Sequence, residues 1–488
     1  MADGRPDGSV LGPSDLLRRR AREAPGRLAL VDGPTRLTWA ELDRLVTSAA
    51  LSLHARGLEP GDRLALCLPT GRDFVALYLG GLRAGLVVVP VNPSYTAPEV
   101  EHLVTDSGAR LLLDPPAAAE LLAQAPAGAD PVLDRGGEAL AVLLYTSGTS
   151  GRTKGAMLPA RALLANLDQI AAVEPPLAGE DDVLFVPLPL SHVFGLNAGL
   201  GVALRTGARL VLADRFDPGA TLVTMAAEQV TAVLAVPGQY AAWLAHPDLR
   251  RGFARVRFAM SGSAALGRGV VDGYAAAGIV LHDGYGATEA APVLTINALG
   301  PGREHPSAGA VGRPLPGVEV QLRDVDGGEV DEGDPGRIFV RGANLFSGYW
   351  PDGADGPDAD GWFATGDIAV ADADGQLRLV GRSTDLVIVN GFNVYPAEVE
   401  AVLAAQPGVA EVAVTGVRHQ RTGEAVQAWV VPAAGARLDP DELRAAAGRS
   451  LARFKLPERI HIVEALPRTV TGKIMKWQLD REDGRGTH

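Results

Sequence analysis

The sequence predicts an α/β protein with a large N-terminal region of parallel sheets covered by helices, a β-rich subdomain, and a small mobile α+β domain at the C-terminus. Three observations support this fold class. Segments of helical and of strand periodicity alternate from residue 37 to about residue 281, which is typical of parallel sheets covered by helices. After about residue 309 short β runs replace this alternation. From residue 385 helices and strands mix over about 100 residues, a normal size for a separate domain.

The elements of the first region follow from hydrophobic periodicity. Residues 114–137 are rich in Ala, Pro, Gly and Asp, which predicts a surface connection. Helices are expected at residues 40–55, 73–84, 160–172, 196–205 and 219–228, and strands at 63–68, 86–89, 183–186, 209–212 and 231–236.

The later elements divide into two groups. Short β runs between residues 309 and 383, two of them joined at Asp374-Gly375 by a strong hairpin signal, predict the β-rich subdomain. We therefore expect an N-terminal domain of residues 1–383 and a C-terminal domain of residues 384–488. The expected strands are 318–322, 337–341, 368–371, 376–380, 386–389, 409–417 and 425–431, and the expected helices are 396–405 and 440–452.

Composition excludes several classes of protein. The chain has 488 residues and a hydrophobic content of 47%, which is enough for two or three globular domains. Its net charge of −13 argues against a general nucleic-acid surface. No run of 18 apolar residues is long enough to span a membrane, and no apolar leader follows the N-terminal arginines. Cys67 stands alone, so we expect a cytoplasmic protein without an intramolecular disulfide, and the oligomeric state stays open.

A glycine-rich string at residues 145–155, Y-T-S-G-T-S-G-R-T-K-G, follows an apolar run of strand length. Glycines let backbone N–H groups turn toward an anion, hydroxyls donate further hydrogen bonds, and a lysine supplies positive charge. The spacing differs from that of a Walker loop. The alternative is a polar turn between a strand and a helix. The predicted phosphate-binding residues are Thr146, Ser147, Gly148, Thr149 and Lys154.

This string resembles the signature loop of the adenylate-forming enzymes, which include acyl-CoA synthetases, firefly luciferase and the adenylation domains of peptide synthetases. The resemblance implies ATP, Mg²⁺ and coenzyme A as cofactors. It extends over nearly the whole chain, because four further strings occur in the order that the family has.

The second string is H-D-G-Y-G-A-T-E at residues 282–289, similar to the family's G-Y-G-x-T-E. By resemblance, Thr288 contacts the α-phosphate and Glu289 holds the Mg²⁺, with Thr146 as a further metal ligand. Hydroxyl and carboxylate oxygens suit this ion because it prefers hard ligands. The alternative is a glutamate that only caps a helix. The same string adds Gly284, Tyr285 and Gly286 to the expected nucleotide site.

Four further residues are assigned by resemblance alone. Asp367 of T-G-D and Arg382 are expected to bind ribose, and Gly391 to line a pantetheine channel. Lys473, in P-R-T-V-T-G-K-I, is expected to reach the carboxylate and α-phosphate during adenylation, since a cation there stabilises the developing negative charge. The family usually has Asp or Lys at the hinge, where this chain has Thr384, which leaves the balance of the two conformations open.

The acid-binding residues are expected around His192, which matches a histidine or aromatic that lines the acyl site in the synthetases. A buried core histidine is the alternative. The malonyl branch of the family has an arginine before G-Y-G where this chain has Asp283, which disfavours a dicarboxylate. The remaining predicted substrate contacts are Val236, Ser261, Gly262, Ser263, Ala264 and Gly286.

The resemblance implies ATP-dependent conversion of a monocarboxylic acid to acyl-AMP with release of pyrophosphate, followed by thioester formation with CoA. Medium-chain fatty acids are placed ahead of aromatic acids. Two alternative reactions stay open: loading of a carrier protein, and adenylation of a small acid such as nitrite for transfer to an amine in a diazotisation. A nucleotide-binding protein without catalysis is disfavoured by Glu289 and Lys473.

Overall fold

The computed structural model describes residues 12–123, 135–147, 153–174, 176–297, 309–383, 385–389, 392–419, 421–468, 474–476 and 478–479. The chain divides into two units, the first of Met1–Val320 with Val340–Phe363 and the second of Gln321–Phe339 with Ala364–His488. Both units combine helices and sheets, so the predicted α/β class is confirmed. The domain boundary at residues 383/384 stays a prediction.

The larger sheet of the first unit has the order β14-β13-β12-β11-β10-β8-β9-β1-β2. Its central strands are parallel and buried, so they read as apolar runs without alternation. Strand β13 lies between β12 and β14 and runs antiparallel to both. The bounds are β1 (Leu28–Asp32), β2 (Thr35–Thr38), β8 (Val183–Val186), β9 (Arg209–Leu212), β10 (Ala232–Ala235), β11 (Phe258–Ser261), β12 (Leu281–Gly286), β13 (Val293–Ile296) and β14 (Ala310–Pro314).

The second sheet of this unit has the order β5-β3-β4-β6-β7. Its first four strands are parallel, and β7 runs antiparallel to β6. The bounds are β3 (Arg63–Leu66), β4 (Val87–Pro90), β5 (Leu111–Leu113), β6 (Leu140–Ser147) and β7 (Thr153–Pro159).

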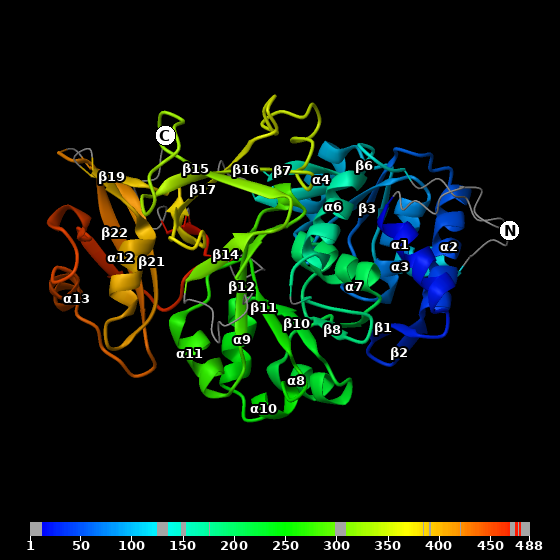
Figure 1. The fold of residues 1–488 in the computed structure, drawn as a ribbon, viewed down its shortest axis with the longest axis horizontal. Helices are drawn as coiled ribbons and strands as arrows, with labels where there is room; N and C mark the ends of the chain where they lie inside the picture. The colour runs from blue at the N-terminus through cyan, green and yellow to red at the C-terminus, as the bar shows by residue number, and fades with distance from the viewer. Residues whose placement is uncertain are drawn as a thin grey trace. The chain divides into compact units, whose positions relative to one another are not determined.

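Helices cover these sheets, and α1, α2 and α3 lie side by side in blue in Figure 1. Helix α2 begins with a capping box, in which the Glu41 carboxylate accepts the Thr38 N–H at 2.8 Å. Gly80 lets α3 approach α2, because a Cβ there would lie 2.7 Å from the Ala49 Cβ. The bounds are α1 (Pro13–Glu23), α2 (Trp39–Ala55), α3 (Arg72–Arg83), α4 (Ala97–Ser107), α5 (Pro115–Ala123), α6 (Ala160–Ala171), η1 (Phe194–Gly201), α7 (Val202–Thr206), α8 (Pro218–Ala227), α9 (Pro237–Leu244), α10 (Leu249–Gly252), α11 (Arg268–Ala276) and η2 (Thr288–Ala290).

Three sequence expectations need correction. The predicted helix at 196–205 is a π-helix, η1, which continues into the short α-helix α7. The region 114–137, expected as a connection, contains helix α5. The glycine loop joins two antiparallel strands instead of a strand and a helix.

The second unit contains a sheet of order β20-β19-β22-β21, with β23 parallel to β22. Helices α12 and α13 pack on one face around Val399, Leu403 and Leu443. Helix α13 ends at Ala447, five residues before the predicted end, where Gly448 follows. The bounds are β19 (Val387–Val389), β20 (Phe392–Val394), α12 (Pro396–Ala404), β21 (Val409–His419), β22 (Gly423–Pro432), α13 (Pro440–Ala447), η3 (Arg453–Lys455) and β23 (Arg459–Ile462).

Strands β15 (Val318–Arg323), β16 (Gly336–Gly342), β17 (Phe363–Ala371) and β18 (Leu377–Arg382) are paired in that order, and the division between the units falls within the first three. The hairpin predicted at Asp374-Gly375 is confirmed, because β17 and β18 pair antiparallel around it. Within the described residues, no helix has the length and apolar character required to cross a membrane.

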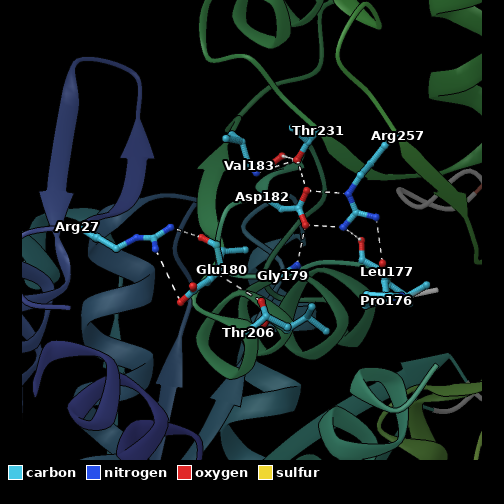
Figure 2. A network of polar contacts seen from close by, with 12 residues as sticks. Arg27, Pro176, Leu177, Gly179, Glu180, Asp182, Val183, Thr206, Thr231 and Arg257 are labelled. Carbon is cyan, nitrogen blue, oxygen red and sulfur yellow. Dashed lines mark hydrogen bonds and ion pairs between the residues drawn. The ribbon is translucent and has the colours of Figure 1, made fainter. Parts of the chain in front are cut away.

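A polar network fixes the amino ends of β8, β10 and β11 (Figure 2). The Asp182 carboxylate accepts hydrogen bonds from Arg257 Nε at 2.9 Å and from Thr231 Oγ1 at 2.7 Å. Thr231 Oγ1 in turn accepts the Val183 N–H at 2.9 Å. Burial raises the pKa of Asp182, but the hydrogen bonds from Arg257 and Thr231 outweigh that effect and leave the pKa below its usual range. The opposite, carboxyl ends of the strands are where parallel sheets bind ligands.

Candidate active site

The first signature string lies on the β6–β7 hairpin. Thr146 is opposite Lys154, and Ser147 is opposite Thr153, so residues 148–152 connect the two strands. Gly148 and Thr149 lie outside the described residues, and of Ser147 only the backbone is described. Lys154 Nζ lies 2.8 Å from Asp355 Oδ2 and 5.0 Å from the centre of the Tyr349 ring.

Tyr145 anchors the start of this string. Its hydroxyl donates to Asp106 Oδ2 at 2.5 Å, and Trp350 Nε1 donates to the Asp106 carbonyl at 2.9 Å. Burial, together with the Asp106 carboxylate, raises the pKa of Tyr145 far above its usual range, so the phenol keeps its proton. These contacts tie the strand that enters the loop to the end of helix α4.

The second signature string forms the end of β12 and the 3₁₀ turn η2, which contains Thr288 and Glu289. The Tyr349 hydroxyl donates to Glu289 Oε1 at 2.5 Å, and the Phe346 N–H donates to the Glu289 carbonyl at 2.8 Å. The half-buried carboxylate of Glu289 and the hydroxyl of Thr288 are hard oxygen donors. They fit a Mg²⁺ that shares its other ligands with phosphates and water.

Three fully buried asparagines hold the backbone that follows Glu289. Asn344 Nδ2 donates to the Ala290 carbonyl at 2.8 Å, and Asn197 Nδ2 donates to the Ala291 carbonyl at 2.7 Å. Asn166 both donates to the Val293 carbonyl at 2.7 Å and accepts the Val293 N–H at 3.1 Å. We call Asn166, Asn197 and Asn344 the asparagine cradle. Its members come from three separate segments, so the position of Glu289 depends on the packing of the whole unit.

The predicted acid-binding residues meet at the carboxyl ends of neighbouring parallel strands. Val236 follows β10, Ser261 ends β11, and Asp283 lies beside Ser261 in register on β12. The Ser261 hydroxyl is buried and has no hydrogen-bond partner among the described residues. Burial raises the pKa of Asp283 to about 7, although the backbone N–H groups of Leu266 and Gly284 donate to its carboxylate.

The loop that follows β11 passes close to an aromatic ring. A Cβ on Gly262 would lie 3.1 Å from the Phe194 ring, so a side chain there would displace the ring or the loop. Ser263 has a φ of 73°, a left-handed conformation that is uncommon outside glycine, and Ala264 follows it. The glycine at 286 is similarly required, because a Cβ would lie 2.1 Å from the Pro292 carbonyl oxygen.

His192 precedes the π-helix η1. Its Nδ1 accepts the Phe194 N–H at 3.2 Å, which leaves the proton of the neutral ring on Nε2. Desolvation lowers the pKa of His192 to about 4, so the ring is neutral at pH 7. It can therefore donate one hydrogen bond from Nε2 but carries no charge to attract a carboxylate.

Sequence reasoning gave no role to Asn297 and did not single out Tyr349 or the asparagine cradle. Asn297 Oδ1 accepts the Asp283 N–H at 2.7 Å, and its Nδ2 donates to the Ala310 carbonyl at 2.9 Å. It thus joins β12 to β14. Each of these side chains bonds to a partner between 13 and 127 residues away in the sequence, and the local sequence carries no signal for such a contact.

The second unit carries the predicted ribose residues. Asp367 and Arg382 are register partners on the β17–β18 hairpin, and Arg382 Nε donates to Asp367 Oδ1 at 2.9 Å. The sequence therefore correctly placed these two side chains together, while their role stays a prediction. Thr384, Gly391 and Lys473 lie outside the described residues.

The segments on either side of residue 473 form ion pairs with other residues of the second unit. Arg468 forms an ion pair with Glu411 at 2.8 Å, and Lys476 forms one with Glu400 at 2.8 Å. The Met475 N–H donates to the Pro467 carbonyl at 2.8 Å.

Comparison with known families decides the identity. Residues 17–350 match the family described as AMP-binding enzyme, and residues 398–473 match the AMP-binding enzyme C-terminal domain. The chain belongs to the AMP-binding enzymes. This AMP-binding enzyme is 39% identical to a feruloyl-CoA synthase of Amycolatopsis sp over 96% of its own length and 98% of the relative. It is 33% identical to a long-chain-fatty-acid–CoA ligase of Yersinia pestis, over 89% and 88% of the two chains.

A solved structure shares the fold of this AMP-binding enzyme. ATP bound MatB from Rhodopseudomonas palustris matches with a TM-score of 0.90 at 34% identity, over 98% of this chain and 99% of that chain. The predicted family is confirmed, and so is the predicted enzyme class of acid–thiol ligases, to which the named ligase relatives belong.

Proposed function

We propose that this enzyme activates a monocarboxylic acid with ATP and transfers the acyl group to coenzyme A. The observation that carries the proposal is the meeting of the two signature strings in one site. Tyr349 contacts Glu289 of the second string through its hydroxyl and lies beneath Lys154 of the first. A cation that can bind phosphate oxygens and a carboxylate that can bind Mg²⁺, held in this arrangement, suit a nucleoside triphosphate with its metal ion.

Each half-reaction has an assigned set of residues. The acid carboxylate attacks the α-phosphorus of ATP, the bond to the β-phosphate oxygen breaks, and pyrophosphate leaves. Thr288 contacts the α-phosphate, and Mg²⁺, when bound at Glu289, offsets the charge of the phosphates. Lys473 stabilises the charge on the reacting groups. The CoA thiol then loses its proton to solvent, its sulfur attacks the acyl carbon, the bond between that carbon and the phosphate oxygen breaks, and AMP leaves. The predicted contacts of the triphosphate are Thr146, Ser147, Gly148, Thr149 and Lys154, and those of the nucleoside are Gly284, Tyr285, Gly286, Asp367 and Arg382.

For the two half-reactions to use one site, we infer that the C-terminal domain changes its orientation between them. We propose that the domain turns about a hinge near Arg382 after the adenylate has formed. Lys473 then leaves the site, and Gly391 lines the channel for the pantetheine arm. The proposal rests on resemblance and on the separate hydrophobic core that surrounds Val399 and Leu403 in the C-terminal part of the chain.

Among monocarboxylic acids we now place aromatic acids ahead of medium-chain fatty acids. The Phe194 ring lies against Gly262, one of the predicted acid contacts, and an aromatic side chain beside the expected acid site favours a flat acyl group. The feruloyl-CoA synthase is also more similar in sequence than the fatty-acid ligase. The buried carboxyl of Asp283 disfavours a second negative charge on the substrate.

Nucleotide product analysis tests the proposal. The enzyme is incubated with ATP, Mg²⁺ and one acid at a time, with and without CoA. The panel runs from acetate to palmitate and includes benzoate and cinnamate types and nitrite. We expect AMP and pyrophosphate with an aromatic acid, and turnover only when CoA is present. AMP release that is indifferent to CoA would instead indicate a carrier protein or an amine as acceptor, and formation of ADP would contradict adenylation.

Lys473→Ala separates the two half-reactions. We expect the variant to lose adenylate formation, because the cation proposed to lie between the carboxylate and the α-phosphate is removed. It should still convert a synthetic acyl-AMP to the thioester with CoA, which serves as the control for folding. Adenylate formation by Lys473→Ala at the wild-type rate would contradict the role of this lysine.

A further inference from the structure

We propose that Tyr349 is a positioning residue that holds the Glu289 carboxylate ready for Mg²⁺ and couples it to Lys154, an inference that rests on the proposed function. Tyr349 lies outside every signature string used above. It nevertheless contacts the charged ends of residues from two of them.

The contact with Glu289 is a short, charge-assisted hydrogen bond. The hydroxyl is 2.5 Å from Oε1, within the range of O–H···O⁻ bonds, which are about twice as strong as neutral ones. The hydroxyl uses one lone pair of Oε1, and the remaining lone pairs of the carboxylate can ligate a metal. The bond also fixes the rotation of the carboxylate, so less side-chain freedom is lost when the metal binds.

The contact with Lys154 is made by the ring face. Lys154 Nζ is 5.0 Å from the ring centre, a distance typical of cation–π attraction. The same ammonium group pairs with Asp355 at 2.8 Å, and both side chains of this pair are partly exposed. The lysine is therefore held near the ring without being buried, in a position from which phosphate oxygens can compete with Asp355.

The segment that carries Tyr349 is fixed by backbone pairing. The Tyr349 backbone is bridged to Ala156 of β7 and to Ala354. Gly348 has a φ of 92°, and a Cβ there would lie 2.1 Å from the Gly353 carbonyl oxygen, so this turn requires glycine. Further backbone bonds join the segment to β7, namely Ser347 N–H to Met157 O at 2.9 Å, Met157 N–H to Gly348 O at 3.1 Å and Trp350 N–H to Gly155 O at 2.8 Å.

This pairing explains how one residue reaches both strings. Strand β7 carries Lys154, and the Phe346 N–H in the same segment donates to the Glu289 carbonyl at 2.8 Å. The segment is thus bonded to the backbone of both strings. A merely structural tyrosine would use its ring, which packs edge-on against Phe346 with centres 5.0 Å apart, but would have no need of a hydroxyl directed at the carboxylate.

Mg²⁺-dependent binding of ATP distinguishes a positioning role of Tyr349 from a merely structural one. Wild type and Tyr349→Phe are titrated with ATP by calorimetry at several MgCl₂ concentrations, with no acid present. We expect Mg²⁺ to tighten ATP binding to the wild type. In Tyr349→Phe the factor by which Mg²⁺ tightens ATP binding should be about tenfold smaller than in the wild type, because a hydrogen bond to a charged group is lost. Its affinity for ATP in EDTA should match that of the wild type, since Phe keeps the ring beneath Lys154.

Two further variants make the test specific. Tyr274→Phe removes another buried hydroxyl, which donates to the Tyr240 carbonyl at 3.0 Å, and should leave the Mg²⁺ gain unchanged. In Glu289→Gln the added Tyr349→Phe change should have no further effect on that gain. Equal Mg²⁺ gains in wild type and Tyr349→Phe, or additive losses in the double variant, would overturn the inference. A wild type that binds no ATP would instead contradict the proposed function.

Discussion

His192 shows how a single residue acquires a property that its type alone does not give. A solvated histidine has a pKa of about 6.5, whereas desolvation lowers the pKa of His192 to about 4. The neutral ring, protonated on Nε2, can orient an acyl or carboxylate group by hydrogen bonding. We do not expect it to act as a proton carrier near pH 7, where an effective acid or base has a pKa close to the pH.

The same shift predicts a dependence of stability on pH. Because the folded pKa lies below the unfolded one, the unfolded chain binds the extra proton first as the pH falls. The contribution of His192 is thus present above about pH 6.5 and lost toward pH 4, with a loss of about 2 kcal/mol between pH 7 and pH 5. The urea concentration at the unfolding midpoint of the first unit should fall less between pH 7 and pH 5 in His192→Gln than in the wild type. An equal fall of the urea midpoint in the two proteins would contradict the claim that His192 is neutral and desolvated in the folded protein.

At the scale of an element, the segment that carries Glu289 is held in place by hydrogen bonds from side chains of other segments. The 3₁₀ turn η2 has only three residues, too few to fix a side chain by helical bonds alone. The asparagine cradle supplies the missing partners, because buried carbonyls must be hydrogen-bonded. The cradle therefore links the candidate metal ligand to α6, η1 and the segment before Phe346.

Asn344→Ala tests this support. The change leaves the Ala290 carbonyl and the Gln169 amide, which donates to Asn344 at 3.2 Å, without their partner. We expect a loss of about 1–3 kcal/mol in the free energy of unfolding of the first unit. Asn92→Ala, at an exposed turn where Asn92 caps Ser94, is the matched control and should cost little. A loss in Asn344→Ala no larger than in Asn92→Ala would show that the cradle is dispensable.

At the scale of the whole molecule, the sequence predicted best what depends on local pattern. The strands at 183–186 and 209–212 were placed to the residue, because short runs of buried apolar residues between turns identify central parallel strands. The hairpin around Asp374-Gly375 was also predicted, and its strands extend far enough for Asp367 and Arg382 to be register partners. The signature strings identified the family, which the comparisons confirm.

What the sequence missed depends on contacts between distant segments. The helix predicted at 196–205 begins as a π-helix over residues 194–201, in which Asn197 reaches the Ala291 carbonyl, a partner 94 residues away. Tyr349 lies 60 residues from Glu289, so no local spacing connects them. Strand β7, which pairs antiparallel with β6, was missed because its residues T-K-G-A-M-L-P show no clear alternation of polar and apolar side chains.

Exchange of labelled pyrophosphate into ATP tests the central claim, adenylation of a carboxylic acid, most directly. The measurement needs ATP, Mg²⁺ and the acid but no CoA, so it isolates the first half-reaction. We predict exchange only when a cognate acid is present, and a loss of at least about 100-fold in Glu289→Gln, as for removal of a transition-state contact. Exchange without any acid, or a Glu289→Gln variant as active as the wild type, would contradict the account.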